Sequence, residues 1–187
     1  ATSMRVLDAM PGTMEERVQQ PAVVWFNGKW WMYYRATDMR GPIPRFRIMV
    51  ATSTTLTAWT RLGKITLEGG VGEWDNGPIE CVGVTLLKTQ EQSIIAMAYG
   101  ACWPWPPEEL RIGFAFSDNG ITFYKSVVNP IWLRAAEWEK ISVDDNAILW
   151  EGGVLKIWYT ARGPPEPGNR IAYGEAVPSN TDTRQIW

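Results

Sequence analysis

Runs of β-branched and aromatic residues, separated by glycine, proline, asparagine and aspartate, follow one another along most of the chain. Such runs predict short β-strands, and no segment shows the 3.6-residue hydrophobic period of an amphipathic helix. Hairpin turns are predicted at Asn27-Gly28 and at Asp118-Asn119-Gly120. The predicted strands cover residues 22–26, 30–36, 46–53, 57–65, 82–87, 93–100, 111–117, 121–127, 147–150, 155–161 and 170–176, with further short strands at 4–7 and 183–187.

An internal repeat groups these strands into three units. Each unit contains an apolar strand that includes a tyrosine, namely Tyr34, Tyr99 and Tyr159. A loop and an arginine-led strand follow each time, beginning at Arg47, Arg111 and Arg170. The tyrosines are 65 and 60 residues apart and the arginines 64 and 59, so two independent landmarks recur together. The arginines are interpreted as structural. The repeat predicts an all-β chain, 1–187, forming a single domain of three four-stranded antiparallel propeller blades at about 18–66, 78–128 and 142–187.

Three blades do not close a ring, because propellers normally have about four to eight. An incomplete ring leaves apolar blade faces exposed. The ring is therefore expected to be completed by a homo-oligomer, for instance a dimer with six blades, or by the rest of a larger protein.

Composition and charge exclude several classes of protein. The 187 residues are 45% hydrophobic and 20% charged, which excludes a disordered chain. The net charge of −2 lacks the basic footprint of a nucleic-acid binder. The longest uncharged stretch, 92–107, is shorter than a membrane span and contains three prolines, so no membrane partner is expected. No signal-peptide core is seen, which favours a cytoplasmic location without fixing it.

The absence of histidine removes much catalytic chemistry. Ser-His and Cys-His nucleophiles and histidine metal sites are impossible, and two cysteines are too few for a four-cysteine zinc site. No metal ligand and no cofactor is predicted. Carboxylates are therefore the expected route to any catalysis.

Several segments resemble a known family. Residues 21–34 read PAVVWFNGKWWMYY, residues 111–125 read RIGFAFSDNGITFYK, and Asn129-Pro130 follows. These segments, with 157–160 and 170–174, resemble blades of the five-bladed propeller glycoside hydrolases, which include arabinanases, invertases and the mannoside phosphorylases. The resemblance covers residues 18 to 176. It implies a propeller-type fold and a saccharide ligand, with carboxylates at the starts of the innermost strands.

The resemblance also suggests candidate catalytic residues. Glu80-Cys81 is similar to the Glu-Cys of the invertase-type acid/base motif, which implies that Glu80 is the acid. Asp145 stands at the next inner-strand start as a base or stabiliser. Gln20 stands where an aspartate would serve as nucleophile or base, and an amide cannot ionise, so enzymatic activity is uncertain.

The loops after the second strand of each blade are expected on the same face as these carboxylates. They add Asp38, Trp103, Trp105 and Arg162 as candidate saccharide-binding residues, together with Gln20. The two tryptophans lie in a proline-stiffened loop, where they either stack on a sugar ring or anchor the loop or an interface. Cys81 and Cys102 are expected close together, as free thiols or as a disulfide.

Structural roles compete with these assignments. Asp144 and Asp145 could cap a turn, Glu80 could pair with Arg47 or Arg111, and Asp75 is expected in a turn. Two functions remain open: a glycoside hydrolase-like protein that acts on a saccharide, and a non-catalytic carbohydrate-binding or assembly module.

Overall fold

The computed structural model describes residues 3–88, 92–101, 110–131, 136–164 and 168–177, and it is built almost entirely of antiparallel strands. The first sheet has the order β1(Arg17–Phe26), β2(Lys29–Asp38), β3(Arg45–Ser53), β4(Thr60–Leu67). The second has the order β5(Ile79–Lys88), β6(Ser93–Ala101), β7(Arg111–Ser117), β8(Tyr124–Lys125). In the third, β10(Val154–Arg162) lies between β9(Ser142–Glu151) and β11(Asn169–Ala176). The propeller-type all-β fold predicted from the repeat is confirmed.

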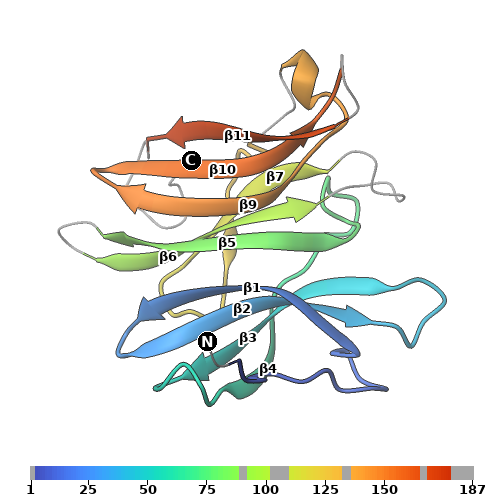
Figure 1. Ribbon diagram of the computed structural model, residues 1–187, viewed down its shortest axis with the longest axis vertical. Coiled ribbons are helices and arrows are strands. Elements are labelled where there is room, and N and C mark those ends of the chain that lie inside the picture. The colour runs from blue at the N-terminus through green and yellow to red at the C-terminus, as the bar shows by residue number, and fades with distance from the viewer. Residues whose placement is uncertain (1–2, 89–91, 102–109, 132–135, 165–167, 178–187) are drawn as a thin grey trace.

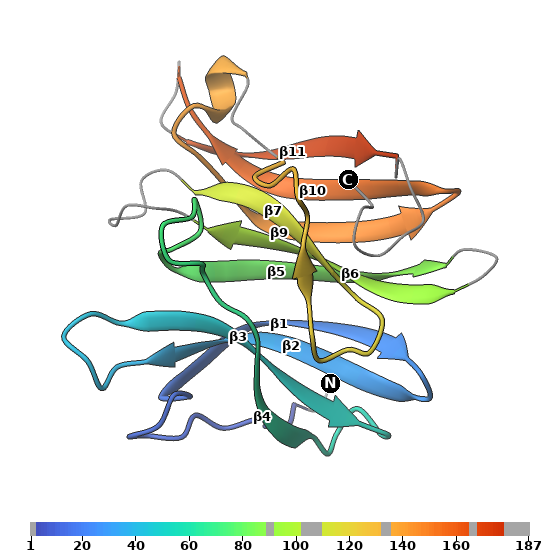
Figure 2. The same cartoon turned by 180° about the vertical axis from the view of Figure 1, so that it is seen from behind.

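The three sheets are stacked so that their innermost strands adjoin. In Figure 1, β1, β5 and β9 lie side by side, and β5 contacts both of the others. The outer strands β4 and β8 come to the front when the molecule is seen from behind (Figure 2). This is the arrangement of blades around a propeller axis.

The second sheet is buried on both faces, which explains the continuous apolar run of β6. Ile95, Met97 and Tyr99 pack on the first sheet, whereas Ile94, Ala96 and Ala98 pack on the third. Successive side chains of a strand point to opposite faces, so a strand between two cores must be apolar at both sets of positions.

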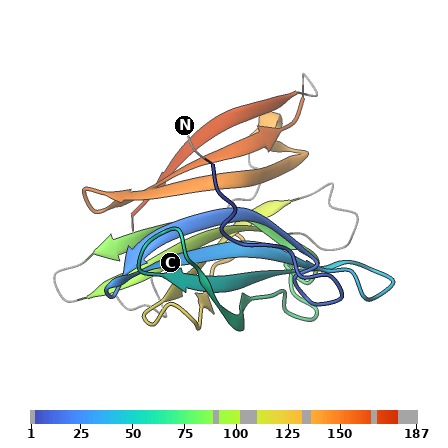
Figure 3. The ribbon, with the colours of Figure 1, turned by 60° about the horizontal axis from the view of Figure 1, so that its bottom comes forward.

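Two predicted strands differ from the structure. Residues 4–7 form no strand; Val6 and Leu7 instead pack against the outer face of the first sheet, which the N-terminal segment crosses in Figure 3. The fourth strand of the second sheet is limited to β8 rather than 121–127. The Asn119 side chain accepts the backbone N–H groups of Ile121 and Thr122 at 2.8 and 2.9 Å, which removes them from strand pairing. The strand predicted at 183–187 lies outside the described residues.

Helical structure is confined to one short element in the part of the chain that the structure describes. It is the 3₁₀ turn at Glu137–Glu139, ahead of β9. No helix among the described residues combines the length and apolar character that crossing a membrane requires.

Each innermost strand carries a β-bulge at the same place. The register with the second strand shifts between Gln19 and Ala22 in β1 and between Glu80 and Gly83 in β5. The corresponding shift in β9 falls opposite the step from Trp158 to Thr160. The single residues left facing the three bulges are the repeat tyrosines, Tyr34, Tyr99 and Tyr159. Bulges bend a strand and re-aim its side chains, so this feature sets the geometry at the axis.

Truncating a side chain between the first two sheets should be costly. Met97 is fully buried in the cluster that joins them, so Met97→Ala should lower the free energy of unfolding by about 2–5 kcal/mol. Val71 is 96% exposed, and Val71→Ala should change it by less than about 0.5 kcal/mol. Urea unfolding measures both, and equal effects would contradict the stacking of the two sheets.

Candidate functional site

The bulges of β1, β5 and β9 bring the candidate residues together at the axis. Gln19, Glu80 and Asp144 occupy the last paired position before each bulge. Gln20 and Asp145 follow as the first bulged residues of β1 and β9, and both have left-handed backbone conformations, with φ of 52° and 43°. Asp144 and Asp145 therefore lie inside a strand and do not cap a turn, which corrects that structural interpretation.

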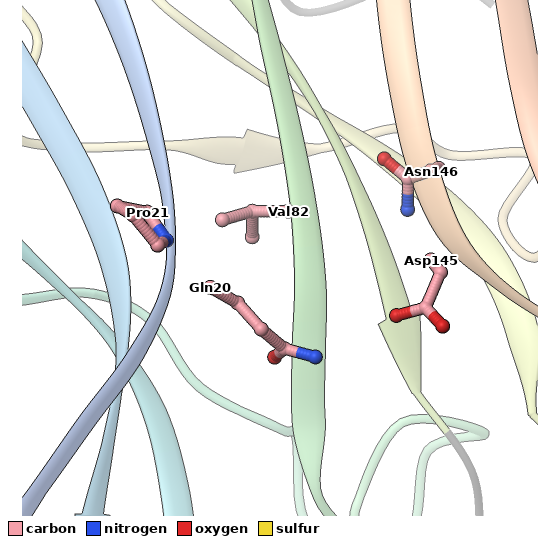
Figure 4. A pocket seen from close by; sticks show the side chains of 5 residues that line it. All are labelled: Gln20, Pro21, Val82, Asp145 and Asn146. Atoms are coloured by element: carbon pink, nitrogen blue, oxygen red, sulfur yellow. The ribbon is translucent and has the colours of Figure 1, made fainter. Parts of the chain in front are cut away.

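A pocket opens where these strands meet. Gln20, Pro21, Val82, Asp145 and Asn146 line it, and its volume is about 240 Å³. Figure 4 shows Gln20 of β1 and Asp145 of β9 on either side of β5, with Val82 between Pro21 and Asn146. All three innermost strands contribute to the pocket, so it depends on the stacking of the sheets.

Arg35 of β2 joins the first two sheets beside this pocket. Its guanidinium forms an ion pair with Glu80 and donates a hydrogen bond to the amide oxygen of Gln19. The partner predicted for Glu80 was Arg47 or Arg111, and the structure corrects this. Arg47 instead lies 3.1 Å from the carboxylate of Glu68.

Arg35 was missed from the sequence, although a signal was present. It directly follows the repeat tyrosine of the first unit, where the other two units have Gly100 and Thr160. A charged residue in an otherwise apolar central strand indicates a specific partner.

Burial and mutual repulsion raise the pKa of two carboxyl groups at the axis. The pKa of Glu80 is raised by burial and by the charge of Asp145, against the opposing influence of Arg35. The pKa of Asp144 is raised to about 6 by burial and by the charges of Asp145 and Glu80, against Arg162 and a hydrogen bond from Ser142. A carboxyl group with a pKa near 6 can exchange a proton at neutral pH, as acid–base catalysis requires.

The remaining candidates differ in their surroundings. Arg162 ends β10 and acts on the charge of Asp144, which brings it to the site. Asp38 ends β2, where Arg40 donates to its two carboxylate oxygens at 2.9 and 2.8 Å and holds its pKa well below the ordinary value. Asp38 is not among the residues that line the pocket. Trp103, Trp105 and Cys102 lie outside the described residues.

Two further points concern the position of Asp75 and the question of a metal site. Asp75 lies in a turn as predicted, and it is fully buried there. Among the described residues, no group of three histidine, cysteine, aspartate or glutamate side chains is arranged to hold a metal ion.

Several solved structures are similar to this chain. A family 117 glycoside hydrolase from the marine bacterium Zobellia galactanivorans matches with a TM-score of 0.69, over 92% of this chain and 56% of its own, at 18% identity. The β-1,2-mannobiose phosphorylase from Listeria innocua, in complex with β-1,2-mannobiose, gives 0.64 over 86% and 44%, at 20% identity. Sucrose-6-phosphate hydrolase from Lactobacillus gasseri gives 0.66 over 85% and 32%, at 15% identity.

These likenesses concern the fold. No protein-family model matches the sequence, and no curated protein matches it significantly. The chain spans about half the length of the first structures that it matches, 56%, 58% and 44%. The fold is that of the propeller glycoside hydrolases, so the resemblance inferred from the sequence is confirmed at this level.

Replacing Asp144 by asparagine should flatten the pH dependence of stability. The folded-state pKa of about 6 lies above the ordinary 3.8. The protonated carboxyl group therefore stabilises the fold below pH 3.8, and this stabilisation is lost as the pH rises through about 6. The loss should be about 1–2 kcal/mol once partial exposure to solvent is allowed for.

Urea unfolding between pH 4 and pH 7 tests this expectation. The free energy of unfolding of Asp144→Asn, relative to that of the wild type, should increase as the pH rises from 4 to 7. The control Asp118→Asn, in a turn away from the pocket, should follow the wild type. Parallel curves for Asp144→Asn and the wild type would contradict the raised pKa.

Proposed function

We propose that this chain binds a saccharide at the axial pocket and acts on it through the carboxylates beside that pocket. One observation carries the proposal: Glu80, Asp144 and Asp145 converge on adjacent strands beside a pocket of about 240 Å³. Saccharide-acting proteins of the same fold, including the mannobiose phosphorylase complex, support a sugar as ligand. The small volume favours a single sugar ring over a long oligosaccharide.

The chemistry follows from the different environments of the carboxyl groups. Hydrolysis of a glycosidic bond needs an acid that protonates the leaving oxygen and a carboxylate that activates water or stabilises positive charge on the ring. Glu80, whose pKa is raised, is suited to hold and donate the proton. Asp145 is exposed at the pocket and is suited to the second role.

The remaining polar side chains are suited to binding. The amide of Gln20 lines the pocket and can both donate to and accept from sugar hydroxyl groups. Arg162 lies close enough to Asp144 to lower its pKa, and it can stabilise that carboxylate when it is ionised. Trp103 and Trp105 remain predicted stacking residues, and Asp38 remains a predicted binding residue.

A second candidate function is saccharide binding without turnover. Gln20 supports it, because this residue occupies the same bulge position as Asp145 but cannot ionise. The ion pair between Arg35 and Glu80 also supports it, because the charge of Arg35 opposes the rise in the pKa of Glu80 that proton donation would use.

Replacing the proposed acid separates the two functions. Glu80→Gln should reduce hydrolysis of the preferred substrate about 10²–10⁴-fold, since that is the usual contribution of a positioned acid. A panel of aryl-glycosides and oligosaccharides measures turnover, and calorimetry on the same sugars measures binding. The control is Glu68→Gln, at a carboxylate that is 58% exposed and bound to Arg47.

The outcomes are distinct. Turnover that survives Glu80→Gln would overturn the role of Glu80. Binding without turnover in the wild type would establish the second function. If the wild-type protein neither binds nor turns over any sugar, a purely structural or assembly role would replace both.

We also propose that another copy of the chain covers the outer face of the third sheet, which is one of the two ways of completing the ring that the count of blades predicts. Apolar side chains are exposed there, namely Leu149, Trp158, Ile171 and Tyr173. The first sheet differs, because Val6 and Leu7 pack on its outer face. An exposed apolar sheet face of this kind is typical of an interface.

Light scattering with size-exclusion chromatography tests this assembly. The wild-type mass should be a multiple of 21.2 kDa, and Ile171→Lys should shift it to 21.2 kDa by placing a charge in the interface. Val71→Lys, at a residue 96% exposed in a turn, is the control. A wild-type monomer at all concentrations would contradict the proposal.

A further inference from the structure

Behind each bulge, a buried tyrosine hydroxyl donates a hydrogen bond to a buried carboxylate. In the first two sheets the donor–acceptor distance is 3.0 Å. The carboxylates are those of Glu15, Asp75 and Glu139, which are 6%, 0% and 4% exposed. The pairs are Tyr34–Glu15, Tyr99–Asp75 and Tyr159–Glu139.

The pairs have the same placement in all three sheets. Each tyrosine is the single residue that faces the two bulged residues of the innermost strand. Each carboxylate belongs to the segment that leads into that strand, four residues before the last paired residue in β1 and five residues before it in β5 and β9. The hydrogen bond therefore links the segment that precedes the innermost strand to the second strand of the same sheet. The bulge, with its site residues, lies between these two linked segments.

The carboxylates are held by further donors. Asp75 accepts the backbone N–H of Gly70 at 3.1 Å and forms an ion pair with Lys125 at 2.7 Å. Glu15 accepts from Arg61 at 2.6 Å. Glu139 accepts the backbone N–H of Ala136 at 3.1 Å. Buried carboxylates with several donors fix one geometry, because any displacement would leave a buried charge without a partner.

Satisfying a buried tyrosine does not require a carboxylate. Tyr33, the neighbour of Tyr34, is equally buried and donates to the backbone oxygen of Gly120 at 2.8 Å. A carboxylate recurs at all three bulges, whereas Tyr33, next to the first bulge, has a carbonyl partner, and this difference indicates a role specific to the bulge.

We propose that the three tyrosine–carboxylate pairs are positioning residues, which hold the three bulges so that Gln20 and the carboxylates Glu80, Asp144 and Asp145 converge at the axial pocket. Tyr99–Asp75 holds the bulge next to Glu80, and Tyr159–Glu139 holds the bulge next to Asp144. This inference rests on the proposed function in that it concerns the same carboxylates, but its test needs no saccharide.

The test reads the electrostatic environment of the site directly. Asp144 owes its pKa of about 6 to burial and to the nearby charges of Asp145 and Glu80. Loosening the bulge by Tyr159→Phe should admit water and separate these groups. The pKa, measured by carbon-detected NMR titration of the side-chain carboxyl groups, should then fall at least halfway toward the ordinary 3.8.

The matched control is Tyr33→Phe, which removes the same hydroxyl from a buried site outside the bulge. It should lower the thermal midpoint by a similar amount and leave the pKa of Asp144 near 6. Glu139→Gln is the conservative variant, since its amide oxygen can still accept from Tyr159, and it should keep the pKa closer to 6 than Tyr159→Phe does.

Each outcome decides the proposal. If Tyr159→Phe destabilises the fold as Tyr33→Phe does but leaves the pKa of Asp144 near 6, the pairs are structural and the proposal is wrong. Should Tyr159→Phe fail to fold, Tyr99→Phe makes the same test at Glu80, whose raised pKa should fall. An unchanged pKa of Glu80 would then overturn the proposal. A saccharide that fails to bind would count against the proposed function and leave this test intact.

Discussion

The two-against-one pairing at each innermost strand is the constraint on which the rest of the structure depends. Two bulged residues face one tyrosine, so the strand bends and one side chain takes a direction that regular pairing would not allow. Gln20 and Asp145 reach the pocket from left-handed backbone conformations, which cost free energy for residues other than glycine. Tyr34 and Tyr159, each hydrogen-bonded to a buried carboxylate, are the residues that face these two conformations.

Electrostatic balance follows from the convergence of these strands. Burial, and then repulsion from the neighbouring carboxylates, raises the pKa of Glu80 and of Asp144, whereas Arg35 and Arg162 oppose the rise. Because Arg35 belongs to the first sheet and Glu80 to the second, their ion pair couples the position of the carboxylate to the packing of the two sheets. The charges of the site and the core between the sheets are therefore parts of one arrangement.

Much of the fold could be predicted from the sequence because period and spacing are local signals. The three repeat tyrosines and the hairpin turns locate the strands, and the apolar run of β6 reflects burial on both faces. The site was only partly predictable, since register shifts leave no periodic trace. Arg35 as the partner of Glu80 depends on how two sheets stack. The motifs Glu73-Trp74-Asp75 and Glu137-Trp138-Glu139, 64 residues apart, were an overlooked signal for the buried carboxylates.

Gln20 and Asp145 show how chemistry and geometry separate in this fold. The two residues have the same bulge position and similar φ angles, and both line the pocket, yet only one can ionise. β1 thus has the same local backbone geometry as β9 without a carboxylate at this position. A strained conformation is expected where the position of a side chain matters, and an amide at a pocket wall can bind hydroxyl groups. In the proposed function, β1 therefore contributes to recognition, whereas β5 and β9 supply the acid–base chemistry.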